Sequence, residues 1–164
     1  GALAQVPAGW LADKFDRRWV MIWLSAAAIV SCGLSAAITS SDIVVIFGLA
    51  GLFGFTTFPI YSVAAAHAHD FADSDQRVEL SAALMFWYAT GAIAAPAFAS
   101  LLIDLYGPAA LFGMIAVGHL GLVVFGLLRM RARPVPDEKT PYVYAPRTSF
   151  TIGRLLRGVR DHKN

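Results

Sequence analysis

Residues 9–18 of this 164-residue chain read Gly-Trp-Leu-Ala-Asp-Lys-Phe-Asp-Arg-Arg, and they place a dense group of charges between two apolar stretches. Residues 1–12 upstream and 19–41 downstream contain no Asp, Glu, Lys or Arg. This pattern is typical of a helix end at a membrane boundary. The glycine lets a neighbouring helix approach closely, and an acid and a basic cluster follow it. An acid and several arginines at one interface can form a charge-assisted network with a neighbouring helix end.

Stretches without charge fill most of the chain: besides 19–41, they cover residues 43–69, 80–103 and 105–128. Each is longer than the ~20 helical residues that cross a hydrocarbon layer ~30 Å thick. The chain is 57% hydrophobic and 15% charged, whereas a soluble domain is about 45–50% apolar and about 25% charged. The expected fold class is therefore all-α, a polytopic helical membrane protein.

Charge-free windows and turn residues together divide the chain. We expect the end of a truncated transmembrane helix at 1–12, a loop at 13–18, four transmembrane helices within 19–128 (about 19–39, 43–66, 80–103 and 108–128), connectors at 39–42, 67–79 and 104–108, and a basic tail at 129–164. Lys and Arg are retained on the cytoplasmic side of a membrane. The basic loops and tail therefore predict a multi-pass protein of the plasma (inner) membrane with a cytoplasmic C-terminus.

The tail differs from the rest of the chain. Its four prolines between 134 and 146 are typical of an extended linker. Beyond them, Ile152, Leu155, Leu156 and Val159 recur at helical spacing with arginines between them. This pattern favours equally a short amphipathic helix on an anionic leaflet and a solvated tail.

Several classes of function are excluded by residue types. The single cysteine, Cys32, rules out a disulfide framework and a cysteine-based metal site. His67 and His69 are two residues apart at a helix end, so their side chains diverge, and we expect neither metal nor cofactor. Nucleic-acid binding would need a basic surface on a soluble domain, but the basic excess lies in the tail. No paired nucleophile and base or carboxylate cluster lies within the apolar windows, so we expect no enzyme.

The motif at residues 9–18 resembles that of the major facilitator superfamily of secondary transporters, G-x-L-A-D-[K/R]-x-G-R-[K/R], found between the second and third helices of each half. The matching residues are Gly9, Leu11, Ala12, Asp13, Lys14, Arg17 and Arg18. Asp16 stands where the family has glycine. This departure predicts a less permissive turn and an added negative charge.

Two further stretches place the resemblance within the family. Residues 49–70 resemble the tenth helix of the YcaD-like bacterial branch, and residues 91–96 resemble the family's G-x-x-x-G-P motif with Ala95 for the second glycine. The resemblance implies a C-terminal half fragment that runs from the end of helix eight through helix twelve, with a missing N-terminal half as its partner. The alternative is an N-terminal half whose central loop is the tail.

The resemblance implies that the tenth and eleventh helices face a central cavity between two six-helix bundles. Polar and aromatic side chains on these helices are then the substrate-cavity candidates: Thr56, Thr57, Tyr61, Trp87, Tyr88 and Thr90. The alternative for Trp87 and Tyr88 is packing or anchoring near a membrane surface.

Other residues are expected to shape the helices rather than bind. Small residues recur in the spans at near-helical spacing, and they predict close helix contacts. Helix bending or packing is expected at Pro59, Gly91, Ala95 and Pro96. His119 lies deep inside a span, and we expect a neutral packed side chain in preference to a proton relay.

The expected function is secondary active transport of a small organic solute by alternating access, coupled to protons. Asp13 with Arg17 and Arg18 is expected to form an inner-gate charge network with a helix of the missing half, alongside the motif residues Gly9 and Lys14. The expected partners are the solute, the lipid bilayer and the missing half. The alternative is a channel-like or structural membrane subunit, for which a charged pore ring is missing from the sequence.

Overall fold

The computed structural model describes residues 2–132, which form helices joined by short connections and contain no strand. The helices are α1 (Ala2–Lys14), α2 (Arg17–Ala37), α3 (Ile43–His69), α4 (Arg77–Tyr106) and α5 (Ala109–Ala132). Helices α2 to α5 are each long and apolar enough to cross a membrane. The fold is thus all-α, as the charge-free windows predict. Of the expected basic tail, only residues 129–132 are described; residues 152–159, for which an amphipathic helix and a solvated tail are the two alternatives, lie outside the described residues.

Aspartates that precede two of the helices explain where those helices begin. The Asp16 carboxylate accepts a hydrogen bond from the Arg18 backbone N–H at 3.0 Å, and Asp42 accepts one from the Val44 N–H at 2.8 Å. Both satisfy a donor that a helix start leaves unpaired. Asp16 has a φ of −63°, an ordinary extended conformation. The glycine of the family pattern is therefore not needed for backbone freedom here, and Asp16 acts as a helix cap.

The connector expected at 67–79 is shorter in the structure, because both flanking helices extend into it. Helix α3 continues to His69, and α4 begins at Arg77. Asp70 ends α3 and donates its backbone N–H to the Ala66 carbonyl at 3.2 Å. His67 and His69 thus lie in the last turn of α3.

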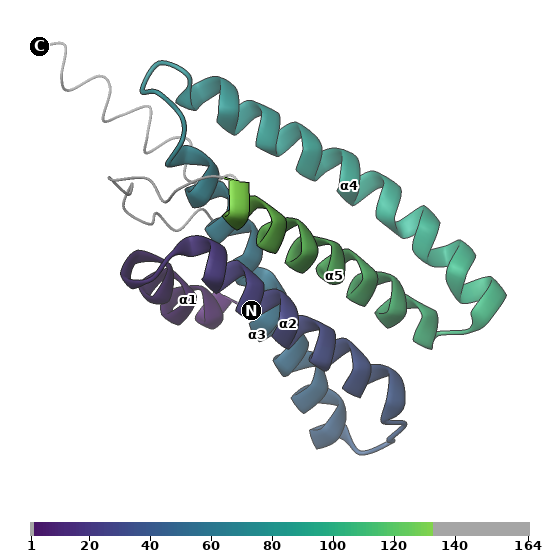
Figure 1. Ribbon diagram of the computed structural model, residues 1–164. Coiled ribbons are helices and arrows are strands. Elements are labelled where there is room, and N and C mark those ends of the chain that lie inside the picture. The colour runs from purple at the N-terminus through teal and green to yellow at the C-terminus, as the bar shows by residue number, and fades with distance from the viewer. Residues whose placement is uncertain (1, 133–164) are drawn as a thin grey trace, which may run out of the picture.

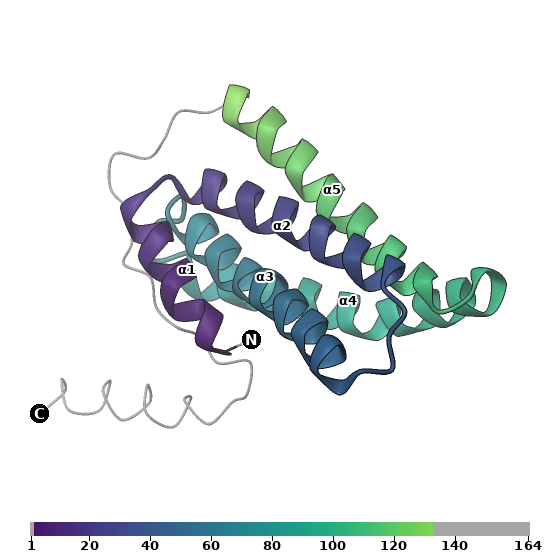
Figure 2. The same cartoon turned by 90° about the horizontal axis from the view of Figure 1, so that it is seen from below.

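Helix α2 lies at the centre of the arrangement and contacts α1, α3 and α5 (Figures 1 and 2). Its buried face is built of small or short side chains from Ser25 to Cys32, which lets the neighbouring helices pack closely. A small core of Ala12, Val20 and Val63 joins α1, α2 and α3. This core lies next to the charged residues of the α1–α2 connection, so packed apolar side chains surround that connection.

Helix α4 is mostly exposed, and within residues 2–132 it contacts only α3 and α5. Ala99 is its one buried residue in this part of the chain, and Phe86, Trp87, Ile93 and Phe98 are each more than half exposed. Apolar surface of this extent is stable only against lipid or further protein. Figure 1 shows α4 on the far side of α5 from α1 and α2.

A close helix contact is found at Gly126 of α5, whereas six of the glycines at near-helical spacing show none. A methyl group added at Gly126 of α5 would lie 3.2 Å from Ile22 Cγ1 of α2, which marks a close approach between the two helices. The same group would meet nothing within 4 Å at Gly48, Gly51, Gly91, Gly113, Gly118 or Gly121. Within residues 2–132, therefore, these glycines do not serve helix packing.

All the Lys and Arg residues of the described chain gather at one end of the helices. The α1–α2 and α3–α4 connections and the end of α5 lie at this end, and the α2–α3 and α4–α5 connections lie at the other (Figure 1). We call the first the charged end; its basic residues are Lys14, Arg17, Arg18, Arg77, Arg129 and Arg131.

Gly107 provides a test of the turn at the opposite end. It ends α4 with a φ of 87°, and its N–H donates to the Ile103 carbonyl at 2.8 Å. An alanine there would be strained by about 1–3 kcal/mol. We therefore expect Gly107→Ala to lower the thermal unfolding midpoint of the detergent-solubilised full-length protein. Gly113→Ala, at an open helical position, should leave the midpoint unchanged or raise it. An equal fall of the midpoint in both variants would contradict the claim that the positive φ of Gly107 requires glycine.

Candidate functional site

Arg17 joins three helices at the charged end. From the first position of α2, its Nη1 donates to the Ala66 carbonyl at 2.9 Å and to Asp70 Oδ1 at 2.7 Å. Its Nη2 donates to Asp13 Oδ1 at 3.3 Å. Because Asp13 is on α1 and Ala66 and Asp70 end α3, one guanidinium links α1, α2 and α3. We call Asp13, Arg17, Asp70 and the Ala66 carbonyl the Arg17 cluster.

Burial makes the Arg17 cluster energetically important. The Arg17 and Asp70 side chains are 1% and 3% exposed, so both charges have lost most of their contact with water. A buried ion pair is tolerated when additional hydrogen bonds satisfy it, and the Ala66 carbonyl provides one. The C-terminus of α3 also carries a partial negative charge that favours a cation. Removing either partner would leave the other charge buried and uncompensated.

Arg18 turns to a local partner. Its Nη2 lies 2.9 Å from Asp16 Oδ2, and its Nε is hydrogen-bonded to the same carboxylate. Burial alone would raise the pKa of Asp16, but the Arg18 hydrogen bonds and charge outweigh this effect and hold that pKa below its ordinary value of 3.8. The added acid at position 16 therefore forms an ion pair with Arg18 at the start of α2.

Both guanidinium groups make contacts within this chain, so a contact of Arg17 and Arg18 with a helix of the missing half stays a prediction. Asp13 differs from them: its side chain is 48% exposed even though it accepts from Arg17. Lys14 lies over the Trp10 ring, with its Nζ 4.9 Å from the ring centroid. Gly9 is buried on α1.

Two of the six cavity candidates come together in space. The rings of Tyr61 on α3 and Tyr88 on α4 have centroids 5.1 Å apart at an interplanar angle of 57°. They form a contact between two helices that otherwise touch little. Trp87 is 70% exposed and packs edge-on against its neighbour Phe86.

The three threonine candidates satisfy their hydroxyl groups on their own helices. Thr56 donates to Leu52 and Phe53 carbonyls at 3.1 and 3.0 Å, and it is only 4% exposed. Thr57 donates to the Phe53 carbonyl at 2.7 Å, and Thr90 donates to the Phe86 carbonyl at 2.9 Å. These hydroxyls keep accepting capacity for a ligand, but burial closes Thr56 to one in this structure.

The residues expected to bend or pack lie within continuous helices. Pro59 is buried inside α3, whereas Pro96 is exposed inside α4. Gly91 and Ala95 are exposed as well, so neither packs closely against the rest of residues 2–132. His119 is half-buried on α5, and its Nδ1 has no hydrogen-bond partner in that part of the chain.

Sequence reasoning missed Asp70 and the Ala66 carbonyl as members of the site. A signal for Asp70 was present, because it is the acid that ends the 43–69 window, two spans beyond Arg17 and hence at the same end. A second link between helices at this end was also missed: Ser81 Oγ on α4 lies 3.3 Å from His69 Nε2 on α3. Among residues 2–132, no group of three or more His, Cys, Asp or Glu side chains is arranged to hold a metal ion.

Four apolar spans whose cations all lie at one end define a multi-pass integral membrane protein. The sequence model of the Major Facilitator Superfamily matches residues 1–160, and the chain belongs to that family of membrane transporters.

Curated relatives support the same assignment. The chain is 32% identical to an uncharacterized MFS-type transporter of Yersinia pestis (strain Pestoides F) over 143 residues. This aligned region covers 87% of the chain and 35% of the relative. It is 34% identical over 144 residues to the uncharacterized MFS-type transporter YcaD of Salmonella typhi, covering 88% of the chain and 35% of that protein. The chain thus spans about a third of the length of these relatives. No solved structure matches it.

The Arg17–Asp70 pair yields a stability prediction. In the full-length protein, Arg17→Ala should lower the unfolding free energy by about 3–5 kcal/mol, because it leaves Asp70 as an uncompensated buried charge. The control is Arg77→Ala, which replaces an exposed arginine at the same end. This variant should change the unfolding free energy by less than about 0.5 kcal/mol. Denaturant unfolding in detergent measures both. The double variant Arg17→Ala, Asp70→Asn should lose less than the sum of its single variants; strict additivity would argue against the pairing.

The lowered pKa of Asp16 predicts a pH dependence. A carboxyl whose pKa is lower when folded stabilises the protein fully above its unfolded pKa, and this stabilisation is lost as pH falls through the folded pKa. Since the folded pKa lies below 3.8, wild type should exceed Asp16→Asn in stability above about pH 5, with the gap closing below about pH 4. Asparagine still caps a helix, so the comparison isolates the charge. An equal difference in stability between wild type and Asp16→Asn at pH 3 and at pH 7 would contradict this pH dependence.

Proposed function

We propose that this chain acts as the C-terminal part of a longer secondary active transporter, which moves a small organic solute by alternating access in a proton-coupled reaction. Family membership provides the transport class. The single observation that supports the gating mechanism is the Arg17 cluster, in which a buried cation ties α1, α2 and α3 together while Asp13 stays half exposed. In this proposal the rest of the transporter is an N-terminal half that completes the solute cavity.

The charged end faces the cytoplasm in this proposal. The argument is that Lys and Arg near helix ends are kept on the inner side of the membrane. All six basic residues of the described chain are at that end. The C-terminus then lies in the cytoplasm as well, because α5 ends there.

The gate itself is assigned to Asp13. Arg17 and Arg18 are buried in ion pairs of their own bundle, whereas the Asp13 side chain, which also pairs with Arg17, is 48% exposed. An exposed carboxylate at a helix end is attracted to the N-terminus of a helix in the opposite half. Contact closes the inner side of the cavity and stabilises the outward-open state, and the contact breaks when the inner side opens.

The solute site is assigned to the faces of α3 and α4 around the Tyr61–Tyr88 pair. Aromatic faces and a few oriented hydroxyls are the usual lining of a site for a small organic solute. Thr57 lies one helical turn from Tyr61 on α3, and Thr90 and the exposed Trp87 lie near Tyr88 on α4. The exposure of α4 supports this assignment, since a cavity-lining helix needs its second wall from the other half.

The alternative functions are a channel-like or structural membrane subunit. They differ from a transporter in a measurable way: a channel dissipates a gradient but cannot build one. Proteoliposomes that contain the full-length protein distinguish the transporter, the channel and the structural subunit. They are supplied with mixed labelled organic solutes and an imposed pH gradient. Gradient-dependent accumulation that a protonophore abolishes supports the proposal. Equilibration without accumulation would indicate a channel, and the absence of solute flux would favour a structural role.

Asp13→Asn tests the gate within the same assay. Asparagine keeps the shape of the side chain but removes the charge that holds the opposite helix end, so uptake of the solute should fall at least several-fold. Asp75→Asn, an exposed acid at the same end, is the matched control and should transport like wild type. Membrane expression of both variants should equal that of wild type. Wild-type uptake by Asp13→Asn would contradict the assignment of the gate.

A further inference from the structure

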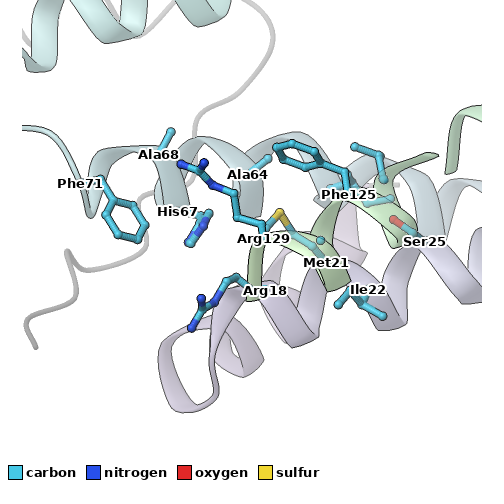
Figure 3. A pocket seen from close by; sticks show the side chains of 13 residues that line it. Arg18, Met21, Ile22, Ser25, Ala64, His67, Ala68, Phe71, Phe125 and Arg129 are labelled. Atoms are coloured by element: carbon cyan, nitrogen blue, oxygen red, sulfur yellow. The ribbon is translucent and has the colours of Figure 1, made fainter. Parts of the chain in front are cut away.

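A pocket of about 520 Å³ lies between α2, α3 and α5 at the charged end, apart from every substrate-cavity candidate (Figure 3). Its volume falls within the range of pockets that hold organic ligands. None of the six cavity candidates lines it, and neither does any residue of α4. The pocket therefore needs an explanation that is separate from the transported solute.

The lining changes character from one end of the pocket to the other. Figure 3 shows Arg129, His67 and Phe71 gathered at one end and Ser25 at the other. Between them the walls are apolar, formed by Met21, Ile22, Ile60, Leu122 and Phe125. Arg18 also lines the pocket, and no Asp or Glu does. A basic mouth above an apolar groove complements a molecule with an anionic head and hydrocarbon chains.

Of the two arginines that line the pocket, Arg129 has the less compensated charge. The Arg18 charge is largely balanced by its ion pair with Asp16. Arg129 is exposed on the last turns of α5, and its side chain forms no ion pair within residues 2–132. An arginine guanidinium matches a phosphate through two parallel N–H bonds. Half-buried His67 adds a ring N–H beside it.

Ser25 provides an independent observation deeper in the pocket. It is 0% exposed, and its Oγ has no hydrogen-bond partner among the described residues. A buried hydroxyl without a partner is costly. Ser25 lies seven residues along α2 from Arg18, which is about 10 Å toward the membrane interior. An ester carbonyl placed just below a phosphate would supply the acceptor that this hydroxyl lacks.

We propose that this pocket binds an anionic phospholipid, with its phosphate at Arg129 and His67, an acyl ester carbonyl at Ser25, and its acyl chains along Met21, Ile60 and Phe125. Basic pockets between membrane helices are a known arrangement for anionic head groups. Leu122 and Phe125 are 48% and 62% exposed, so the pocket is open along α5 and the chains extend from it into the bilayer. Bound in this way, the lipid fills the space between α2, α3 and α5 beside the Arg17 cluster.

Binding can be measured without knowledge of the transported solute, so the outcome is independent of the proposed function. The delipidated full-length protein is titrated with phosphatidylglycerol or phosphatidylcholine and examined by native mass spectrometry. We expect one phosphatidylglycerol to bind more tightly than phosphatidylcholine. Arg129→Ala should weaken phosphatidylglycerol binding about fivefold, the effect of one basic residue near an anionic membrane surface.

The matched control is Arg131→Ala, which removes the same charge two residues away on the same helix from a residue that does not line the pocket. It should bind phosphatidylglycerol within about twofold of wild type, since the lost charge lies outside the pocket. A second variant, Ala64→Phe, fills the pocket without changing charge and should also displace the lipid.

Three outcomes would overturn the proposal. Equal losses in Arg129→Ala and Arg131→Ala would mean a diffuse surface attraction. Equal binding of the two lipids would remove the role of the basic mouth. Tighter phosphatidylglycerol binding after deletion of residues 134–164 would mean that the chain's own tail occupies the pocket.

Discussion

The helices at the charged end depend on one buried cation. Arg17 is at the start of α2, where the helix dipole disfavours positive charge, and it is almost fully removed from water. Such a position is stable only because the end of α3 provides a carboxylate and a carbonyl, and α1 provides a second carboxylate. The requirement to satisfy this one guanidinium fixes how α1, α2 and α3 meet. The Ala12, Val20 and Val63 core forms directly beside it.

This arrangement divides the motif into two roles. Arg17 links the helices of one bundle through Asp70, and Arg18 pairs locally with Asp16 at the start of α2. Among the acids that pair with these arginines, Asp13 alone retains substantial exposure. In the proposed mechanism a rigid bundle and a breakable contact are both needed, because a gate that deformed its own bundle would not transmit motion to the cavity.

The fold was predictable from the sequence, and the site only partly. Charge-free stretches such as 43–69 and 105–128 are physically decisive, because few structures other than membrane helices bury so many consecutive apolar residues. The motif pointed to Asp13, Arg17 and Arg18, but periodicity cannot tell which acid a buried arginine selects. Asp70 lies more than fifty residues from Arg17 in the sequence and pairs with it only because α2 and α3 run antiparallel. The glycine positions show that a sequence pattern can also predict too much. The near-helical spacing of Gly113 and Gly118 favoured close helix contacts, and residues 2–132 contain none at these two positions.

The most direct test is whether α1, α2 and α3 move as one unit around Arg17. Spin labels at the exposed positions Trp10 on α1 and Phe55 on α3, in the full-length protein, report the distance within the bundle by pulsed electron paramagnetic resonance. A second pair joins Trp10 to the other half. On changing pH across the membrane of proteoliposomes, the second distance should shift between two values while the first stays constant. A Trp10–Phe55 distance that changes along with the second would contradict a bundle held rigid by the Arg17 cluster.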